Sequence, residues 1–390
     1  MAKLNLRLAL AAALTCALSL SVAHAEIGVT DDTIVIAGMG ALTGPFTNTI
    51  LPQLHGAQLV FEEANAAGGI NGRKIVYQME DDECLPEKAV GAVKKLIYED
   101  KPFMIVGGGC SNAAIAQKPE VIAAKIPWVI VASTADSLTE PVNAYIYSSM
   151  SAAWMEVSAQ LQYAIDQGKK RIAVVWQPDA WGKARIEPLK ATLDKRGIKA
   201  VAIEEIPVEP TDVTATALKL KAADPDAVLM LLFPKAAVPY LRDTYKIGLQ
   251  PLAIGGSPLQ EIEVLAKGVG SPDGVKNVRA VAANGFGNDD PQVATWKQKI
   301  EKRFPNERFN GFHMFGIEAG QFAVEALKQA GRELTREKII EVMSTLTVKS
   351  DVDRGPLKCT PEDHQCHRTL GIFALENGRV TAVGSATPAR

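Results

Sequence analysis

Short apolar runs and longer amphipathic segments alternate along most of this chain. The run Thr33–Met39 is followed by Leu54–Ala67, in which apolar residues recur at helical spacing until two glycines end the pattern. Two further runs, Phe103–Val106 and Trp128–Val131, flank a second helix-like segment. Apolar runs separated by helices are typical of parallel strands that are buried on both faces. The first part of the chain is therefore predicted to be an α/β domain.

The same alternation begins again in the second part of the chain. The apolar runs Arg171–Trp176 and Asp226–Leu232 are each flanked by segments with helical periodicity. A chain of 390 residues is too long for one ordinary hydrophobic core, so about two domains are expected. We therefore predict two α/β lobes, each built on a doubly wound parallel sheet. Near the C-terminus, Asn377 and Gly378 separate two short apolar runs and indicate a hairpin turn.

Small polar residues follow two neighbouring apolar runs within the stretch Ile105–Asp136. In an open α/β sheet, ligands bind outside the carboxyl ends of the strands. We therefore predict that Ser111 and Thr134 form adjacent parts of one binding cleft. The alternative is that both hydroxyl groups only cap helices. The two polar triplets are Cys110-Ser111-Asn112 and Ala132-Ser133-Thr134.

The first 25 residues have the pattern of a secretory signal peptide. Lys3 and Arg7 precede the apolar stretch Leu8–Val22, and a small-x-small cleavage pattern ends at Ala25. The apolar stretch is short for a membrane span, so we expect cleavage after Ala25 and export of the remainder. The formal net charge of −2 gives no indication of a nucleic-acid partner.

The cysteines indicate disulfides. One of the five cysteines, Cys16, lies in the predicted signal peptide, which leaves an even number in the exported part. Even numbers of cysteines in exported chains favour disulfide bonds. Order along the chain favours Cys84 with Cys110 and Cys359 with Cys366, while the other two pairings stay open.

Metal, catalytic and nucleotide sites are all disfavoured. The segment Cys359–His367 contains two cysteines and two histidines, which are zinc ligands, but an oxidising compartment favours a disulfide there, so we expect no metal. The segment Gly109–Ala113 is not a G-x-S-x-G elbow, and no motif places a histidine for a catalytic triad. The glycines of Gly38–Gly44 do not fit G-x-G-x-x-G. We therefore expect neither an enzyme nor a cofactor.

Several motifs together resemble those of the leucine/isoleucine/valine-binding family, the type I periplasmic solute receptors of ABC importers. The resemblance covers residues 26 to about 383 and implies a Venus-flytrap fold, in which three crossover strands join two α/β lobes around the ligand. It implies a first lobe of residues 26–146 and 281–349, and a second of residues 147–280 and 350–390. The motifs are Leu42-Thr43-Gly44-Pro45, Ala64–Gly72, Asp81–Cys84 with Cys110-Ser111, and Gly355-Pro356-Leu357.

The resemblance also implies which residues hold the ligand. In the family, a disulfide matching Cys84–Cys110 lies at the edge of the cleft, and hydroxyl and backbone groups nearby bind a carboxylate. Such groups at helix starts favour an anion without a buried cation. Aromatic residues would close over the ligand, although each could instead belong to a hydrophobic core. The implied ligand-binding residues are Phe46, Ser111, Asn112, Ala132, Ser133, Thr134 and Phe312 in the first lobe, with Trp181, Phe233 and Ser257 in the second.

Ser257 is the position at which this chain departs from the amino-acid receptors. Those receptors carry a glutamate there that pairs with the ligand's ammonium group, whereas no acidic residue follows here until Glu261. An unpaired ammonium group in a closed cleft is costly. We therefore expect an aromatic or apolar carboxylate, such as a benzoate or cinnamate derivative. The alternatives are a branched-chain or other amino acid, an amide, or a role as a ligand-sensing receptor subunit.

The resemblance implies a two-state mechanism. The open form binds the ligand on its first lobe, and closure of the hinge completes the pocket with the second lobe. The closed form then docks on a membrane permease driven by an ATPase. We expect a monomer in the periplasm, with a small-molecule carboxylate as its ligand.

Overall fold

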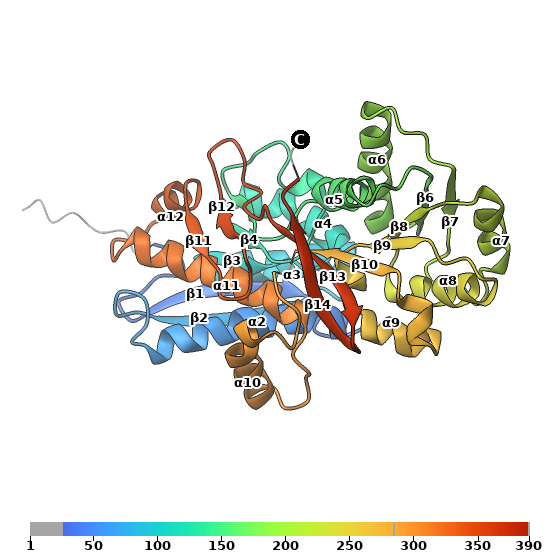
Figure 1. Ribbon diagram of the computed structural model, residues 1–390. Helices are drawn as coiled ribbons and strands as arrows, with labels where there is room; N and C mark the ends of the chain where they lie inside the picture. The colour runs from blue at the N-terminus through green and yellow to red at the C-terminus, as the bar shows by residue number, and fades with distance from the viewer. Residues whose placement is uncertain (1–25, 284, 389–390) are drawn as a thin grey trace, which may run out of the picture.

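The computed structural model of the protein describes residues 26–283 and 285–388, and the predicted signal peptide lies outside these ranges. Two large β-sheets form two lobes that lie side by side, with helices packed on the sheet faces (Figure 1). No helix within the described ranges is long and apolar enough to cross a membrane. The two-lobed α/β fold agrees with the alternation of apolar runs and helices in the sequence.

The first sheet is parallel throughout, with the strand order β2-β1-β3-β4-β5. Its inner strands are buried because helices cover both faces. The strands are β1 (Thr33–Gly40), β2 (Lys74–Asp81), β3 (Met104–Gly107), β4 (Trp128–Ile130) and β5 (Ile146–Ser148). The helices of this lobe are α2 (Thr47–Ala66), α3 (Pro86–Lys95), α4 (Ser111–Ala123), α10 (Ala294–Arg303), α11 (Gly311–Ala330) and α12 (Arg336–Met343).

The second sheet is mixed, with the order β14-β13-β10-β9-β8-β6-β7. Strands β6 to β10 pair in parallel, as predicted, and β13 and β14 add two antiparallel strands at one edge. The predicted turn at Asn377 and Gly378, which both have positive φ, joins these two strands. The strands are β6 (Ile172–Trp176), β7 (Ala202–Glu205), β8 (Ala227–Leu231), β9 (Leu252–Gly255), β10 (Val278–Ala282), β13 (Leu370–Glu376) and β14 (Arg379–Ala386). The helices are α5 (Ala153–Asp166), α6 (Ala180–Lys195), α7 (Thr214–Ala223), α8 (Pro234–Lys246) and α9 (Ile262–Val269).

The chain passes between the lobes three times: after β5, after β10, and on the way from α12 to β13. The third passage contains a small antiparallel pair, β11 (Thr347–Lys349) and β12 (Pro356–Lys358). The expected lobe boundaries at 146/147 and 280/281 fall inside β5 and β10. Because β5 belongs to the first sheet and β10 to the second, the connections themselves begin a few residues later.

Glycines allow α2 and α11 to pack closely in the first lobe. A Cβ atom added at Gly56 would lie 2.2 Å from His313 O, and one at Gly316 would lie 1.8 Å from Gln53 O. Both distances are too short for real atoms, so a larger residue at either position would push the helices apart. This packing fixes the position of the first half of α2, which follows β1 at the carboxyl edge of the sheet.

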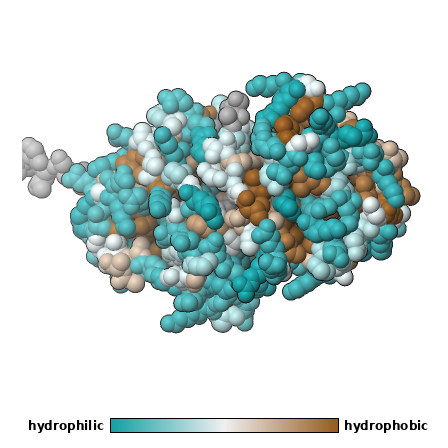
Figure 2. Space-filling model, viewed as in Figure 1, coloured by the Kyte–Doolittle hydropathy of each residue, from teal (hydrophilic) through white to brown (hydrophobic). Residues whose placement is uncertain are grey.

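Hydrophobic side chains are grouped rather than spread evenly over the face shown in Figure 2. Most of this face is hydrophilic, and a hydrophobic patch runs along β14 where the two lobes meet. Val383 of β14 is among the exposed large hydrophobic residues. The strand lies at the edge of the second sheet, so one side of it has no neighbouring strand.

Candidate functional site

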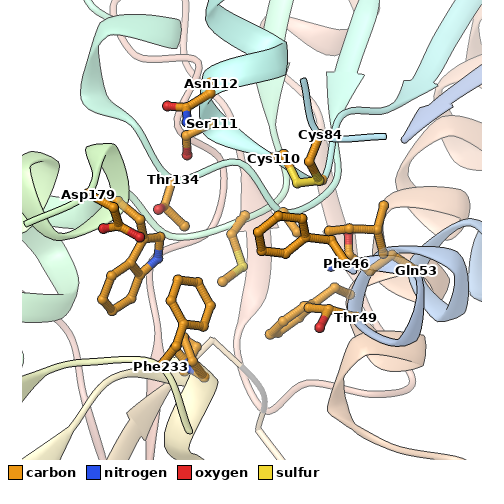
Figure 3. A pocket seen from close by; sticks show the side chains of 18 of the residues that line it. Phe46, Thr49, Gln53, Cys84, Cys110, Ser111, Asn112, Thr134, Asp179 and Phe233 are labelled. Carbon is orange, nitrogen blue, oxygen red and sulfur yellow. A yellow bond between two sulfur atoms is a disulfide. The ribbon is translucent and has the colours of Figure 1, made fainter. Parts of the chain in front are cut away.

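A cavity of about 140 Å³ lies between the two lobes. Its first-lobe wall comes from the loops after β1, β3 and β4 and from the start of α2, and its second-lobe wall comes from the loops after β6, β8 and β9 (Figure 3). All these loops lie at the carboxyl ends of strands, where ligands bind in open α/β sheets. The cavity is therefore the candidate binding site.

The structure brings most of the predicted ligand residues to this cavity, but not all. Ser133 does not line it, because its side chain is buried and its hydroxyl group donates a hydrogen bond of 3.0 Å to Gly108 O. Phe312 does not line it either, and its ring packs edge-on against Phe315, which does. The predicted residues that line the cavity are Phe46, Ser111, Asn112, Ala132, Thr134, Trp181, Phe233 and Ser257.

The start of α4 forms the polar part of the first-lobe wall. Ser111 is the first residue of this helix, so the N-cap is Cys110, whose side chain makes no capping hydrogen bond. The first N–H groups of a helix have no partner within the helix, and they favour an anion bound at that end. Ser111 and Asn112 are labelled beside this end of α4 in Figure 3. The capping alternative for Ser111 is therefore wrong, and its hydroxyl group faces the cavity region.

Both expected cysteine pairs are present. Cys84 is bonded to Cys110, with a Cα–Cα distance of 5.5 Å, and Cys359 is bonded to Cys366. The first disulfide lines the cavity and holds the residue that precedes α4. The second removes two of the four ligands from the zinc pattern considered in the sequence. A third ligand, His364, instead hydrogen-bonds through Nδ1 to Asn143 O and Ile146 O.

A buried arginine, which the sequence analysis missed, lies in the second-lobe wall. Arg185 on α6 is 1% exposed. Its Nη2 atom donates to Thr134 Oγ1 at 2.9 Å across the lobe boundary, and its guanidinium lies 3.7 Å from the centre of the Trp181 ring. A buried cation, which the predicted anion site did not require, therefore lies beside it. The capping alternative for Thr134 is also not seen, because its hydroxyl oxygen accepts this bond from arginine.

Glu156 on α5 is the partner of Arg185, and both of its carboxylate oxygens are engaged. Oε2 accepts a hydrogen bond from Arg185 Nε at 2.8 Å and forms an ion pair with Nη2 at 2.7 Å. Oε1 accepts from Ser257 N at 2.7 Å and from Ser257 Oγ at 2.6 Å. These three hydrogen bonds take up most of the roughly four acceptor positions that a carboxylate offers. In the amino-acid receptors this position is expected to carry a glutamate. Here Ser257 takes its place, and the nearby carboxylate is that of Glu156 from α5.

Other polar residues of the cavity were also missed, among them Asp179 and Gln53. Asp179 is the N-cap of α6, where Oδ1 accepts from Gly182 N at 2.8 Å and Oδ2 from Gln177 Nε2 at 2.6 Å. Gln53 on α2 is 2% exposed, and its Oε1 atom has no hydrogen-bond partner among the described residues. In Figure 3, Asp179 and Gln53 lie on opposite sides of the cavity. Asp179 could be suspected from its place before a helix, but a glutamine within a helix gives no such signal.

Aromatic and aliphatic side chains form the rest of the wall. Trp181 and Phe233 pack against each other with ring centres 4.7 Å apart. Trp181 lies in the first turn of α6 and Phe233 directly precedes α8; both line the cavity, and Trp181 also packs against the hydrophobic core. Apolar walls with a few polar groups are typical of small-molecule sites. The other apolar lining residues include Phe46, Ile50, Met150 and Phe315.

A second group of titratable side chains lies outside the cavity. Glu318, Asp353 and His367 bring potential metal-ligand atoms within 4.8 Å of one another, and all three residues are buried. Burial raises the pKa of Glu318 to about 7. Burial alone would lower the pKa of His367, but the neighbouring carboxylates of Glu318 and Asp353 outweigh it and raise the pKa to about 9.

Comparison with known proteins places the chain in a family. The sequence model of the periplasmic binding protein family matches residues 33–379. The chain belongs to this family. An amino acid binding protein from Pseudomonas aeruginosa is 28% identical over 300 residues, which cover 76% of this chain and 79% of the relative.

Solved structures of type I periplasmic binding proteins share the fold. A solute-binding protein of an ABC transporter from R. palustris in complex with benzoate has a TM-score of 0.77 and 20% identity, covering 92% of this chain and 97% of that one. LivJ from Streptococcus pneumoniae in complex with isoleucine has a TM-score of 0.76 and 19% identity, with coverages of 92% and 100%. The chain is thus a periplasmic binding protein rather than an enzyme, and it shares the fold of these solved structures.

Proposed function

We propose that this periplasmic binding protein captures a small aromatic or apolar carboxylate between its lobes and delivers it to a membrane permease. The observation that carries the proposal is the engagement of Glu156. Both of its carboxylate oxygens are held by Arg185 and Ser257, and Glu156 is not among the residues that line the cavity, so it is poorly placed to pair with a ligand ammonium group. A ligand with a carboxylate but no ammonium group therefore suits this part of the site better than an α-amino acid does.

The carboxylate end of the ligand would face Ser111 and Thr134. Because Thr134 Oγ1 accepts a hydrogen bond from Arg185, its own proton is free to be donated to an anion. The uncapped N–H groups at the start of α4 would add further donors. The positive charge of Arg185, although offset by Glu156, strengthens hydrogen bonding along this path because the group is buried.

The body of the ligand would pack between the aromatic walls. Trp181 and Phe233 from the second lobe face Phe46 and Phe315 of the first, and all four line the cavity. Planar rings stack well on such side chains. The partnerless Oε1 atom of Gln53 lies away from Ser111 and Thr134 (Figure 3), where it could accept a hydrogen bond from a hydroxyl group on the ligand's far end.

Closure of the lobes would be coupled to ligand binding through Arg185 and Thr134. Their 2.9 Å hydrogen bond joins α6 of the second lobe to the loop after β4 in the first. A carboxylate bound beside Thr134 would add contacts to both lobes and stabilise the closed form. The closed monomer would then be recognised in the periplasm by a permease and its ATPase. No cofactor takes part in this scheme.

Asp179 supports a second candidate function, binding of an amino acid. Its carboxylate lines the cavity and accepts two hydrogen bonds, from Gly182 N and Gln177 Nε2, which leaves acceptor positions for an ammonium group. The Pseudomonas aeruginosa relative is named as an amino acid binding protein. We rank this function second because Asp179 already serves as the N-cap of α6.

A thermal-shift panel tests the proposal. Benzoate, 4-hydroxybenzoate and cinnamate are compared with leucine, isoleucine and valine on the protein lacking residues 1–25. A ligand at a hundred times its Kd should stabilise the folded state by roughly 2.7 kcal/mol. We expect shifts with the aromatic acids only. Shifts with the amino acids alone, abolished by Asp179→Asn, would instead establish the second function.

A further inference from the structure

We propose that Glu318, Asp353 and His367 bind a divalent transition-metal ion, with Zn²⁺ as the natural probe. The three residues come from three separate segments: the middle of α11, the chain after β11, and the chain before β13. They lie outside the ligand cavity, so this site does not depend on the ligand that the protein carries.

The separations within this group suit a shared ion better than direct pairing. His367 Nδ1 lies 3.4 Å from Glu318 Oε2 and 3.8 Å from Asp353 Oδ2. Ligands about 2.1 Å from a tetrahedral zinc ion are roughly 3.4 Å apart. Ion pairs in direct hydrogen-bond contact are normally about 2.7–2.9 Å long. The same protein contains such pairs, including Arg185–Glu156 at 2.7 Å and His313–Glu307 at 2.9 Å.

The ligand atoms are oriented as metal ligands usually are. His367 donates its other ring N–H, at Nε2, to the backbone carbonyl of Thr369, so Nδ1 can bind a metal once the ion displaces its proton. Asp353 Oδ1 accepts a hydrogen bond of 2.7 Å from Arg354 N, which leaves Oδ2 facing His367. Metal-bound histidines and carboxylates are typically held by such bonds on their outer sides.

Two buried atoms of the group lack any hydrogen-bond partner among the described residues: Glu318 Oε1 and His367 Nδ1. The exposed fractions of Glu318 and His367 are 2% and 1%, so bulk solvent does not reach these atoms. A buried polar atom without a partner costs about 1–3 kcal/mol. One divalent ion would engage both atoms, with Glu318 bidentate as a fourth ligand, and would neutralise the two carboxylates.

The competing explanation is a proton in place of the metal. A protonated His367 would carry a hydrogen on each ring nitrogen, and it would balance one of the two carboxylates. That arrangement predicts a direct hydrogen bond from Nδ1 to an oxygen, and the 3.4 Å separation is longer than such a bond. The two explanations differ in whether the protein takes up a metal ion.

The position of the group gives the ion a structural role. Asp353 lies in the third passage between the lobes and packs against Gly285, just after β10, where an added Cβ would be 2.5 Å from Asp353 Oδ1. Glu318 belongs to α11 of the first lobe, and His367 precedes β13 of the second sheet. The ion would therefore stabilise the third connection between the lobes by linking it to α11 and to the segment before β13.

The test uses the full mature protein, stripped with EDTA and then titrated with Zn²⁺. We expect one equivalent of zinc by mass spectrometry and a Tm that rises by several degrees on zinc addition. Glu318→Gln should weaken zinc binding by at least about tenfold. Asp82→Asn serves as the matched control, because Asp82 is a buried carboxylate with its own partners, Cys84 N and Gln117 Nε2.

An anomalous-scattering map of a zinc-soaked wild-type crystal covers the case in which Glu318→Gln does not fold. A zinc peak between Glu318, Asp353 and His367 would establish the site. The proposal fails if the wild-type protein takes up no zinc and its Tm changes with neither zinc nor EDTA. It also fails if Glu318→Gln and Asp82→Asn bind zinc equally, or if the peak lies elsewhere.

Discussion

The two walls of the cavity are built in different ways. The polar part of the first-lobe wall consists of hydroxyl groups and N–H groups that directly follow β3 and β4, with Ser111 and Thr134 at its centre. The second-lobe wall rests on the buried pair of Arg185 and Glu156 together with Ser257. One wall is neutral and locally encoded, whereas the other is a charged network assembled from distant segments. The first suits any carboxylate, so selectivity should reside in the second.

The largest effect is expected from breaking the charged network. Arg185→Met should lower the free energy of unfolding by about 3–5 kcal/mol, because Glu156 is left as an unpaired buried charge. Adding Glu156→Leu should recover most of this stability but not ligand binding. Urea denaturation and titration with the best ligand measure the two effects.

The control for that experiment is Arg196→Met at the end of the same helix, where the arginine bonds Gln162 in an exposed setting. It should change stability by less than about 0.5 kcal/mol. If Arg185→Met lowers the free energy of unfolding as little as Arg196→Met does, charge does not hold the second-lobe wall together. The two walls would then not differ in the way described.

The neutral wall should be more tolerant. Thr134→Val keeps the shape of the side chain but removes the hydroxyl group that would contact the ligand. We expect a loss in affinity of about 1.5–3 kcal/mol, or roughly tenfold to over a hundredfold, as for a hydrogen bond to a charged group. Ser133→Ala is the matched control, because Ser133 lies beside Thr134 but does not line the cavity. Equal losses from both variants would contradict the assignment of Thr134.

Acid should destabilise the first lobe through Glu307, a half-buried carboxylate that hydrogen-bonds to His55 and His313. Burial alone would raise the pKa of Glu307, but hydrogen bonds from His313 and His55 outweigh it and lower the pKa to about 2. A lowered carboxyl pKa stabilises the folded state fully above about pH 4.5, and this contribution is lost as the pH falls toward 2. We expect a loss of about 1–2 kcal/mol, reduced by partial solvent exposure.

Urea unfolding of Glu307→Gln at pH 7 and at pH 3 measures this contribution. The variant should lose less stability than wild type between the two pH values, while Glu341→Gln, at an exposed position, should behave like wild type. An unchanged pH dependence in Glu307→Gln would show that another group governs the acid response.

The smallest effect concerns Gln53 at the far end of the cavity. Gln53→Met removes the partnerless acceptor while keeping a side chain of similar length. If this atom accepts a ligand hydroxyl group, the variant should lose about 0.5–1.5 kcal/mol of affinity for 4-hydroxybenzoate and nothing for benzoate. Gln117→Met, another buried glutamine outside the cavity lining, is the control. Equal losses for both acids would show that Gln53 only shapes the wall.

The sequence predicted cavity residues best where those residues directly follow a strand. The apolar run before Gly107 predicted β3, and the rule that ligands lie at strand ends located Ser111 and Thr134. Trp181 and Phe233 were implied by the resemblance to the family, and each also follows a strand of the second sheet. The antiparallel β13 and β14 were not foreseen as part of that sheet, since a hairpin signal does not reveal its neighbours.

The network of Glu156, Arg185 and Ser257 could not be predicted from the sequence, and the reason is physical. Glu156 meets Arg185 across 29 residues and Ser257 across 101, so no local spacing records the contacts. Glu156, Arg185 and Ser257 each lie in a segment whose apolar pattern predicts secondary structure but gives no sign of a role in the cavity. The sequence correctly shows that position 257 itself is not acidic. It does not show that Glu156 of α5 reaches this position and hydrogen-bonds to Ser257. The chemistry of this wall exists only once the helices have packed.

The close packing of α2 against α11 has a consequence for the evolution of this receptor. Gly316 has no contact with the cavity, yet any side chain there would press on the backbone of Gln53 and shift the wall. Ligand preference could therefore be retuned from a position that no ligand reaches. A directed-evolution library confined to the pocket would overlook Gly56 and Gly316. Substituting alanine at each, and screening for altered preference rather than lost folding, would reveal how much selectivity is inherited from the scaffold.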